Sequence, residues 1–199
     1  EGRLQDFNWK VGLLSQTRSD KTPVSISYYG NIAIDARPGN KFFLKQHRYS
    51  YFHQLIIARR FNPKFSLQIA PSVSHYNGVE FYKENDRFSI AFGGRYKISD
   101  QTSFVFDYSQ PITTFDRDPG DYIDIENGML RDELDGKPNP LNQPGISLGV
   151  EFGTSAHTFQ IFISNYRGIV PQQNYMKNRN DFFNNGILIG FNITRNYNF

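Results

Sequence analysis

Hydrophobic residues alternate with polar or small residues along nine segments of the chain. In the clearest segment, residues 87–98, Phe88 and Phe92 fall on one face while Ser89 and Ala91 fall on the other. Because successive side chains of a β-strand point to opposite faces, this pattern predicts strands with one apolar face. No stretch shows an amphipathic helical pattern of comparable quality, so we expect an all-β fold. The nine predicted strands cover residues 7–13, 24–34, 49–60, 65–74, 87–98, 103–109, 146–153, 158–164 and 187–199.

Two of these segments depart from strict alternation. In the third segment, Phe52 and Ile56 interrupt the polar face. In the fourth, Pro71 lies inside the strand. Proline has no N–H to donate to a neighbouring strand and is found at edges and bulges, so Pro71 predicts a β-bulge.

Short and long connections between the predicted strands alternate along the whole chain. An up-and-down arrangement puts alternate connections at opposite ends, and outer-membrane barrels have short periplasmic turns and long external loops. A soluble sandwich with Greek-key connections gives no such alternation. We therefore predict one domain, residues 1–199, forming an antiparallel up-and-down transmembrane β-barrel. The short connections are 15–23, 62–64, 99–101 and 154–156, and the predicted external loops are 35–47, 77–86, 110–144 and 165–185.

Composition supports this choice and removes several others. The 199 residues include no cysteine, which excludes disulfides and thiolate metal sites, and the formal net charge of +3 is too small to indicate a nucleic-acid partner. A mean hydropathy of −0.56 and the lack of an 18-residue apolar run exclude a transmembrane helix but not a barrel, whose strands are half polar. Aromatic residues make up 16% of the chain, which fits aromatic girdles at two membrane interfaces.

The end of the chain resembles the assembly signal of outer-membrane barrels, which the barrel assembly machinery reads. The last predicted strand finishes with Tyr197 and Phe199 on its apolar face. Arg195 departs from the pattern, which prefers an apolar residue at that place. We expect the outer membrane of a Gram-negative bacterium as the location, and its bilayer and lipopolysaccharide as partners.

Several longer stretches resemble a β-barrel family of Bacteroidota outer membranes known as domain of unknown function 5777. That resemblance implies a signal peptide and about three further strands before the point where this chain begins. Nine strands is also an odd number, whereas bacterial single-chain barrels have even numbers, so about 12 strands are expected in the full-length protein. The family has no established activity to carry over. The resembling stretches are residues 52–61, 65–68, 93–97, 157–160, 165–168 and 190–195.

The polar face predicts a charged barrel interior. Counted from the short turns, Arg95 and Glu151 lie at similar depth, with Asp107 between them and slightly higher. Such a group predicts either a constriction selecting small polar or anionic solutes, or an ion-pair network that holds the wall together. The predicted interior charges are Arg60, Arg87, Arg95, Lys97, Asp107 and Glu151, and the predicted interior amides are Gln54, Gln68, Gln160 and Asn192.

The loop 110–144 concentrates acidic residues. Carboxylates this close together can bind Ca²⁺ through oxygen, although the spacing matches no EF-hand loop. A solvated acidic loop beside divalent-bridged lipopolysaccharide is the default interpretation. The length of the loop makes it a candidate for folding into the interior or for docking a partner. No other metal site and no cofactor is predicted. The weak Ca²⁺ candidates are Asp116, Asp118, Asp121, Asp124 and Glu126.

Three functions stay open from the sequence. The first is a passive pore for small polar solutes, or a barrel subunit of an envelope complex. The second is a structural or docking barrel whose interior is filled by side chains. The third and weakest is a surface hydrolase built on His47 or His75; Ser74 adjoins His75 but faces the opposite side of the strand, so the two cannot act as nucleophile and base. We therefore expect no enzyme.

Overall fold

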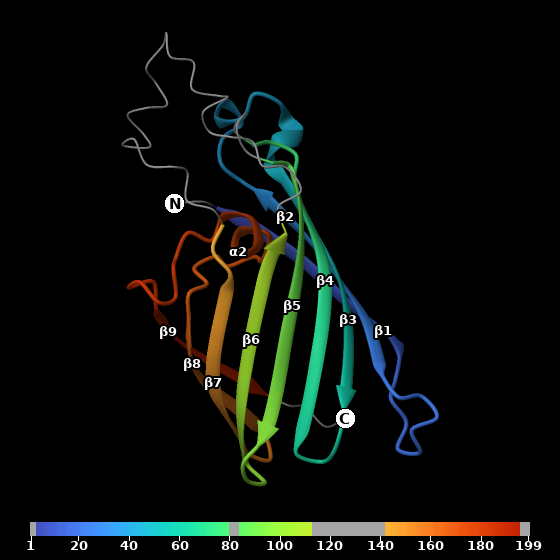
Figure 1. The fold of residues 1–199 in the computed structure, drawn as a ribbon. Coiled ribbons are helices and arrows are strands. Elements are labelled where there is room, and N and C mark those ends of the chain that lie inside the picture. Colours follow the sequence, from blue (N-terminus) through green and yellow to red (C-terminus); the bar gives the residue numbers. More distant parts are fainter. Residues whose placement is uncertain (1–2, 80–83, 113–141, 196–199) are drawn as a thin grey trace.

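The nine predicted strands form one antiparallel sheet. The computed structural model describes residues 3–79, 84–112 and 142–195. Within them the spatial order of the strands follows the chain, each strand pairing with the next (Figure 1). The all-β, up-and-down prediction is therefore confirmed. The strands are β1 (Leu4–Leu14), β2 (Ser25–Asp35), β3 (Tyr49–Arg60), β4 (Phe65–Tyr76), β5 (Asp86–Lys97), β6 (Thr102–Ile112), β7 (Gly145–Gly153), β8 (His157–Ser164) and β9 (Leu188–Arg195).

Strand boundaries differ from the predicted ones at several ends. β1 begins three residues earlier than expected because Leu4 pairs with Asp35. β6 continues to Ile112, which pairs with Phe88, so residues 110–112 belong to the sheet and not to the following loop. Pairing beyond the apolar alternation accounts for both differences, since a polar residue can extend a ladder without extending the hydrophobic pattern.

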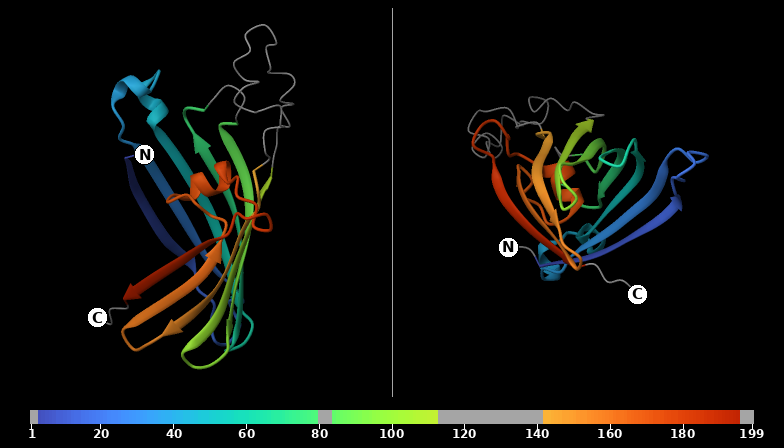
Figure 2. Two further views of the ribbon diagram at one scale, coloured as in Figure 1. Left: turned by 90° about the vertical axis from the view of Figure 1, so that its left-hand side faces the viewer. Right: turned by 90° about the horizontal axis from the view of Figure 1, so that it is seen from below.

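The sheet curves into an open arc. Seen along the strands, it runs from β1 at one end to β9 at the other, and these two strands do not pair within the described residues (Figure 2). The described connection between β2 and β3 lies at one end of the arc, and the short turns lie at the other (Figure 1). We call these the long-loop end and the short-turn end.

The two faces of the sheet differ in the sense the alternation predicts. On the inner, concave face of β4 and β5, the side chains of Ser72, Ser89 and Ala91 are buried. On the outer face, Phe88 and Phe92 keep 50% and 40% of their surface exposed. The apolar face of the sheet thus points away from the interior, as in a barrel that presents it to lipid. Among the described residues no helix has the length and apolarity needed to cross a membrane.

The predicted bulge at Pro71 is wrong. Pro71 pairs in register with Ile90 of β5, and the β3–β4 register is the same on both sides of it. Instead, Leu55 and Ile56 of β3 have no paired residue on β4 beside Pro71, and no extra residue is inserted. The register shift occurs in β1, between Gly12 and Leu14.

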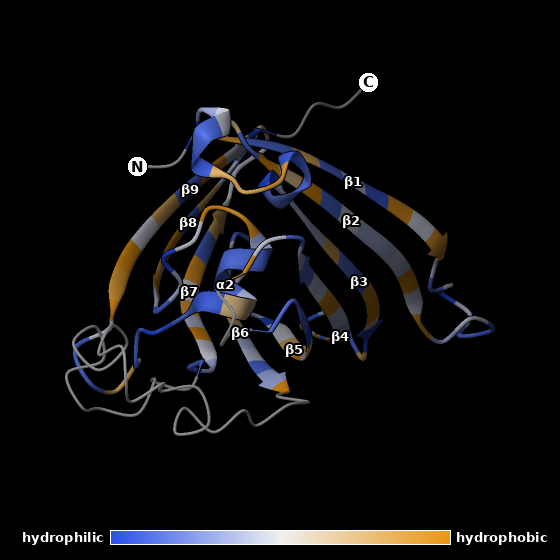
Figure 3. Ribbon diagram, turned by 90° about the horizontal axis from the view of Figure 1, so that it is seen from above, coloured by the Kyte–Doolittle hydropathy of each residue, from blue (hydrophilic) through white to orange (hydrophobic). Residues whose placement is uncertain are grey.

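Helical structure occurs only in long connections of the described chain. Two 3-10 turns, η1 (Gly39–Lys41) and η2 (Lys45–Arg48), lie between β2 and β3. An α-helix, α2 (Pro171–Lys177), lies in the connection between β8 and β9. Figure 3 places α2 inside the arc, where it contacts β3, β4, β5 and β6. Loop 165–185 therefore folds inward, and residues 113–141 of the predicted external loop 110–144 lie outside the described residues.

Candidate functional site

The candidate site is the segment 165–185, here called the interior loop, together with the inner face that it covers. Its first anchor is Tyr166, whose hydroxyl lies 2.6 Å from Oγ of Ser109 and donates a 3.3 Å hydrogen bond to Oδ1 of Asp107. The tyrosine ring lies over Gly145, where a Cβ would come within 2.1 Å of ring atoms. Gly145 thus provides the space that lets the interior loop approach β6 and β7.

Asn165 fastens the base of the interior loop. The residue is completely buried, and its Nδ2 donates hydrogen bonds of 2.8 Å to the carbonyl oxygens of Pro144 and Asn180. Its Oδ1 accepts a 2.8 Å bond from the backbone N–H of Ile146. Asn180 returns a bond from Nδ2 to the Asn165 carbonyl at 3.0 Å. One asparagine therefore joins the start of β7 to both ends of the loop.

Gln172 anchors helix α2 to the opposite side of the arc. Its side chain is fully buried, and Nε2 donates to Oδ1 of Asn31 at 2.7 Å and to Oγ of Ser50 at 3.4 Å. Asn31 in turn donates from Nδ2 to Asp6. The helix is thereby connected through β2 to β1, at the far end of the sheet from the loop's own strands.

Tyr175 adds an apolar contact beside these polar ones. Its ring centroid lies 5.1 Å from that of Phe52, which is 1% exposed, and its hydroxyl accepts a 3.3 Å hydrogen bond from Nε2 of Gln54. Burial, and secondarily the negative charge of Asp107, raise the pKa of the Tyr166 and Tyr175 phenols. Both phenols therefore stay neutral hydrogen-bonding groups around physiological pH.

The structure brings three of the predicted interior residues into contact. Arg95 donates to Oε1 of Glu151 from Nε at 3.0 Å and from Nη2 at 2.7 Å. Gln160 donates to the other oxygen, Oε2, at 2.9 Å. This group connects β5, β7 and β8 toward the short-turn end. The Arg95 side chain is 51% exposed, so screening by water keeps the contribution of the ion pair small.

The other predicted charges do not join this group. Asp107 belongs to the Tyr166 cluster, Arg87 pairs with Glu84 at 3.3 Å, and Lys97 pairs with Asp100 at 3.1 Å. The partners of Arg87 and Lys97 lie in the neighbouring connection of the chain, and the partner of Asp107 lies on the interior loop. The strand pattern alone does not locate such residues. Among the remaining predicted residues, Gln54 contacts Tyr175, Gln68 lies beside Gly93, Asn192 pairs with Gln160 across β8 and β9, and Arg60 is exposed.

Some predicted residues lie outside the described part of the chain. These include the assembly-signal residues Tyr197 and Phe199, so that prediction stays untested. They also include the Ca²⁺ candidates of loop 110–144. In the described ranges, no three histidine or acidic side chains gather in a way that could hold a metal ion. The Ca²⁺ candidates outside the described residues are Asp116, Asp118, Asp121, Asp124 and Glu126.

His75 does not form a hydrolytic site with Ser74. Nδ1 of His75 lies 2.7 Å from Oδ1 of Asp86, and Nε2 lies 2.8 Å from Oδ1 of Asn77. Both ring nitrogens therefore already have partners. Ser74 is fully buried on the inner face, which places its hydroxyl away from the imidazole.

The strand pattern missed the residues that anchor the interior loop, namely Tyr166, Gln172 and Tyr175. One signal pointed toward them. Phe52 stands on an otherwise polar face, and an inward phenylalanine in a barrel needs an apolar cover. The structure supplies that cover as Tyr175.

Comparison with protein families gives one match. The profile of the membrane bound beta barrel domain, DUF5777, matches residues 1–197, in agreement with the resemblance seen in the sequence. Searches of curated proteins and of solved structures gave no match. The open arc, the outward apolar face and this match agree, and the chain belongs to the DUF5777 family of membrane bound beta barrel domains.

Proposed function

We propose that this domain is a structural or docking barrel whose interior is filled toward the long-loop end by its own interior loop. The single observation that carries the proposal is the complete burial of Gln172, with its amide bonded to Asn31 on β2 and Ser50 on β3. A loop that merely rested at a pore mouth would leave such a side chain in water.

The balance of energies favours the filled interior. If the loop left the interior, water would replace most of the lost hydrogen bonds, so each bond contributes a net of only about 1 kcal/mol. Phe52 and Val170, each 1% exposed, cannot be compensated in this way. Exposing one large apolar side chain costs about 1.5–3 kcal/mol. The apolar contacts thus decide the position of the loop, and the polar ones fix its orientation.

The apolar outer face of the sheet indicates what surrounds the domain. Exposed rings such as Phe88 and Phe92 would lie against hydrocarbon, so the bilayer is the first partner. We place the domain in the outer membrane of a Gram-negative bacterium, with lipopolysaccharide and the barrel assembly machinery as further partners. No catalytic role is assigned.

A passive pore for small polar solutes is the second candidate. It is favoured by the half-exposed Arg95 and by exposed Gln68 and Asn192 on the inner face near the short-turn end. These groups would give a polar, hydrated lining below the interior loop.

Single-channel recording in planar bilayers separates the two candidates. The full-length protein is compared with a Tyr166→Phe/Gln172→Ala variant and with a Tyr96→Phe/Gln46→Ala control, which makes the same chemical changes at exposed positions. The filled barrel predicts no steady ohmic steps from the wild type and the control, and steps from the first variant. Equal steady conductance from all three proteins would reject the filled barrel in favour of the pore.

A further inference from the structure

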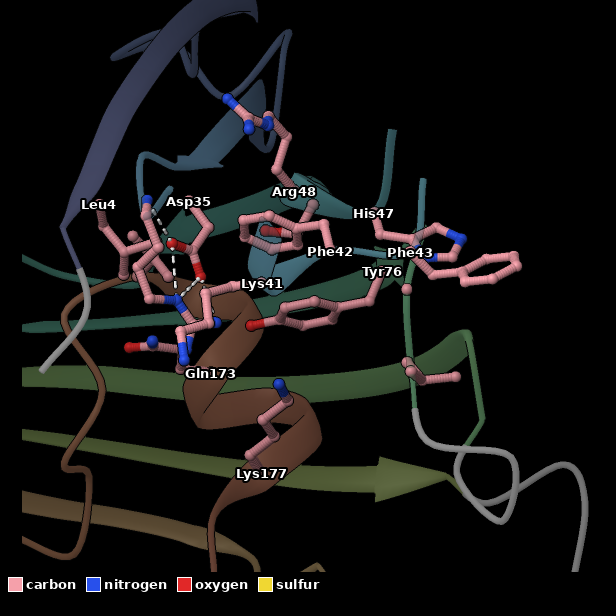
Figure 4. Close-up of a pocket in the computed structure, with 15 residues that line it drawn as sticks. Leu4, Asp35, Lys41, Phe42, Phe43, His47, Arg48, Tyr76, Gln173 and Lys177 are labelled. Atoms are coloured by element: carbon pink, nitrogen blue, oxygen red, sulfur yellow. Dashed lines mark hydrogen bonds and ion pairs between the residues drawn. The ribbon is translucent and has the colours of Figure 1, made fainter. Parts of the chain in front are cut away.

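A cavity of about 520 Å³ lies at the long-loop end, above helix α2. Figure 4 shows it between α2, the end of β4 and the segment that connects β2 to β3. Cavities of this size hold small ligands in many proteins. Its wall belongs to the concave side of the sheet, because Lys177 and Gln173 of the inward-lying helix line it. The cavity therefore faces away from the outer, apolar face.

Most of the charged side chains that line the cavity are basic. Asp35 is the sole carboxylate that lines the cavity among the described residues, against four basic side chains. Arg37 engages this carboxylate from Nε at 2.8 and 3.0 Å and from Nη2 at 2.6 Å. That ion pair raises the pKa of Arg37, and the same carboxylate also attracts Arg48. The other three basic side chains are Lys41, Arg48 and Lys177.

The guanidinium of Arg48 has a hydrogen-bond donor without an acceptor among the described residues. Its carbon Cζ lies 5.3 Å from the ring centroid of Phe42, and Cζ of Arg37 lies 5.5 Å from the same centroid. The Nε of Arg48 is buried and has no hydrogen-bond partner among the described residues. A buried unsatisfied donor is costly, and two like charges around one ring repel each other. An anion in the cavity would relieve both costs.

Lys177 approaches from the opposite wall. Its Nζ lies 4.2 Å from the ring centroid of Tyr76, so the ammonium stands at the floor of the cavity while Lys41 and Arg48 stand above it (Figure 4). Phe42 and Tyr76 also offer flat apolar surfaces beside the charges. The wall thus combines positive charge with aromatic faces that pack against a sugar ring or another flat group.

We propose that this cavity binds a soluble small molecule carrying a phosphate monoester, such as a sugar phosphate. Arg48 and Lys41 add two positive charges beyond the Arg37–Asp35 pair, which suits a dianion better than a single carboxylate. The planar fork of arginine matches phosphate oxygens, and lysines add point charges. A lipid phosphate has the same chemistry, but the concave position of the wall favours the soluble source. The site does not require the interior below it to be closed.

Binding to the full-length protein in detergent micelles tests the proposal by calorimetry. The probes are glucose 6-phosphate, with glucose as the neutral control, and an anionic phospholipid in mixed micelles. The variants are Arg48→Gln and Lys41→Gln, each compared with Lys64→Gln or Arg18→Gln, which remove a charge from exposed positions at the short-turn end. Thermal melting followed by circular dichroism checks that each variant is folded.

The proposal predicts that glucose 6-phosphate binds and glucose does not. Each cavity substitution should weaken binding about tenfold, the effect of losing one charge-assisted hydrogen bond, and the controls should leave it unchanged. Absence of glucose 6-phosphate binding to the wild type would overturn the proposal. So would equal weakening by Lys64→Gln, or selective binding of the phospholipid. If Arg48→Gln unfolds the protein, Lys41→Gln, at an exposed side chain, still decides.

Discussion

The side-chain amide of Gln172 donates a 2.7 Å hydrogen bond to Oδ1 of Asn31, and both residues are completely buried. The two lie 141 positions apart in sequence. Their contact joins the last long connection of the chain to the second strand, across the hollow of the sheet. A barrel wall needs no such contact to hold together, because its strands already pair through the backbone. The bond instead fixes what lies inside the wall.

Replacing Gln172 by alanine should loosen helix α2 without disturbing the sheet. The change leaves Asn31 Oδ1 and Ser50 Oγ without this donor, at a cost of about 1–3 kcal/mol. Hydrogen exchange should therefore accelerate in residues 171–177 and stay unchanged in β4 and β5. Gln46→Ala, at an exposed position of the same end, serves as the control. Unchanged exchange in the helix would show that Gln172 does not anchor it.

Gly145→Ala should displace the interior loop through Tyr166. The new methyl group would meet the tyrosine ring at 2.1 Å, so the ring must move and give up its contacts with Asp107 and Ser109. We expect a loss of about 1–3 kcal/mol, typical of overpacking. Gly12→Ala is a matched control, because no atom lies within 4 Å of its added Cβ. Denaturant unfolding compares the two, and equal stabilities would contradict the assigned role of Gly145.

The buried tyrosines predict a loss of stability at alkaline pH. Burial raises the pKa of Tyr175 above the ordinary 10.0, so the folded state holds the phenolic proton more tightly than the unfolded state. The resulting stability is fully present below pH 10 and is lost as the pH rises above it.

Tyr175→Phe should lessen this alkaline fall in melting temperature, because one of the buried phenols is gone while Tyr166 remains. Tyr96→Phe, at a residue that is 50% exposed, should leave the fall as in the wild type. The same slope above pH 10 in all three proteins would contradict the link between buried phenols and stability.

Glu151→Gln should have only a small effect on stability. Arg95 is half exposed, so the lost ion pair should cost less than about 1 kcal/mol, and a glutamine can still accept a hydrogen bond from Gln160. Chemical unfolding measures the change. A loss of several kcal/mol would instead assign this group a structural role at the centre of the wall.

The alternation of side chains was sufficient to predict the sheet, because one face had to be apolar and the other polar all along each strand. It placed Arg95 and Glu151 at similar depth on the inner face for the same reason, and in the structure the two side chains bond. It did not predict α2. The sequence Pro-Gln-Gln-Asn-Tyr-Met-Lys has no apolar stripe, and a helix of seven residues is not stable alone. The helix exists through Gln172 and Tyr175, whose partners are distant in sequence.

The basic cavity was equally beyond the strand pattern. Arg37, Lys41 and Arg48 stand in an irregular connection, and Lys177 stands on α2. The placement of the interior loop brings Lys177 to the other three. Pro71 shows the opposite failure, where a local rule suggested a bulge although the sheet keeps its register around the missing N–H and only two neighbouring pairs of the β3–β4 ladder are lost.

Cysteine labelling tests the position of the interior loop most directly, since the chain has no native cysteine. Val170 is 1% exposed, and its neighbour Ile169 is 86% exposed. In the folded full-length protein in detergent, a polar maleimide should label Ile169→Cys rapidly and Val170→Cys at least tenfold more slowly, with equal rates after unfolding. Equal rates in the folded protein would contradict a loop packed inside the barrel.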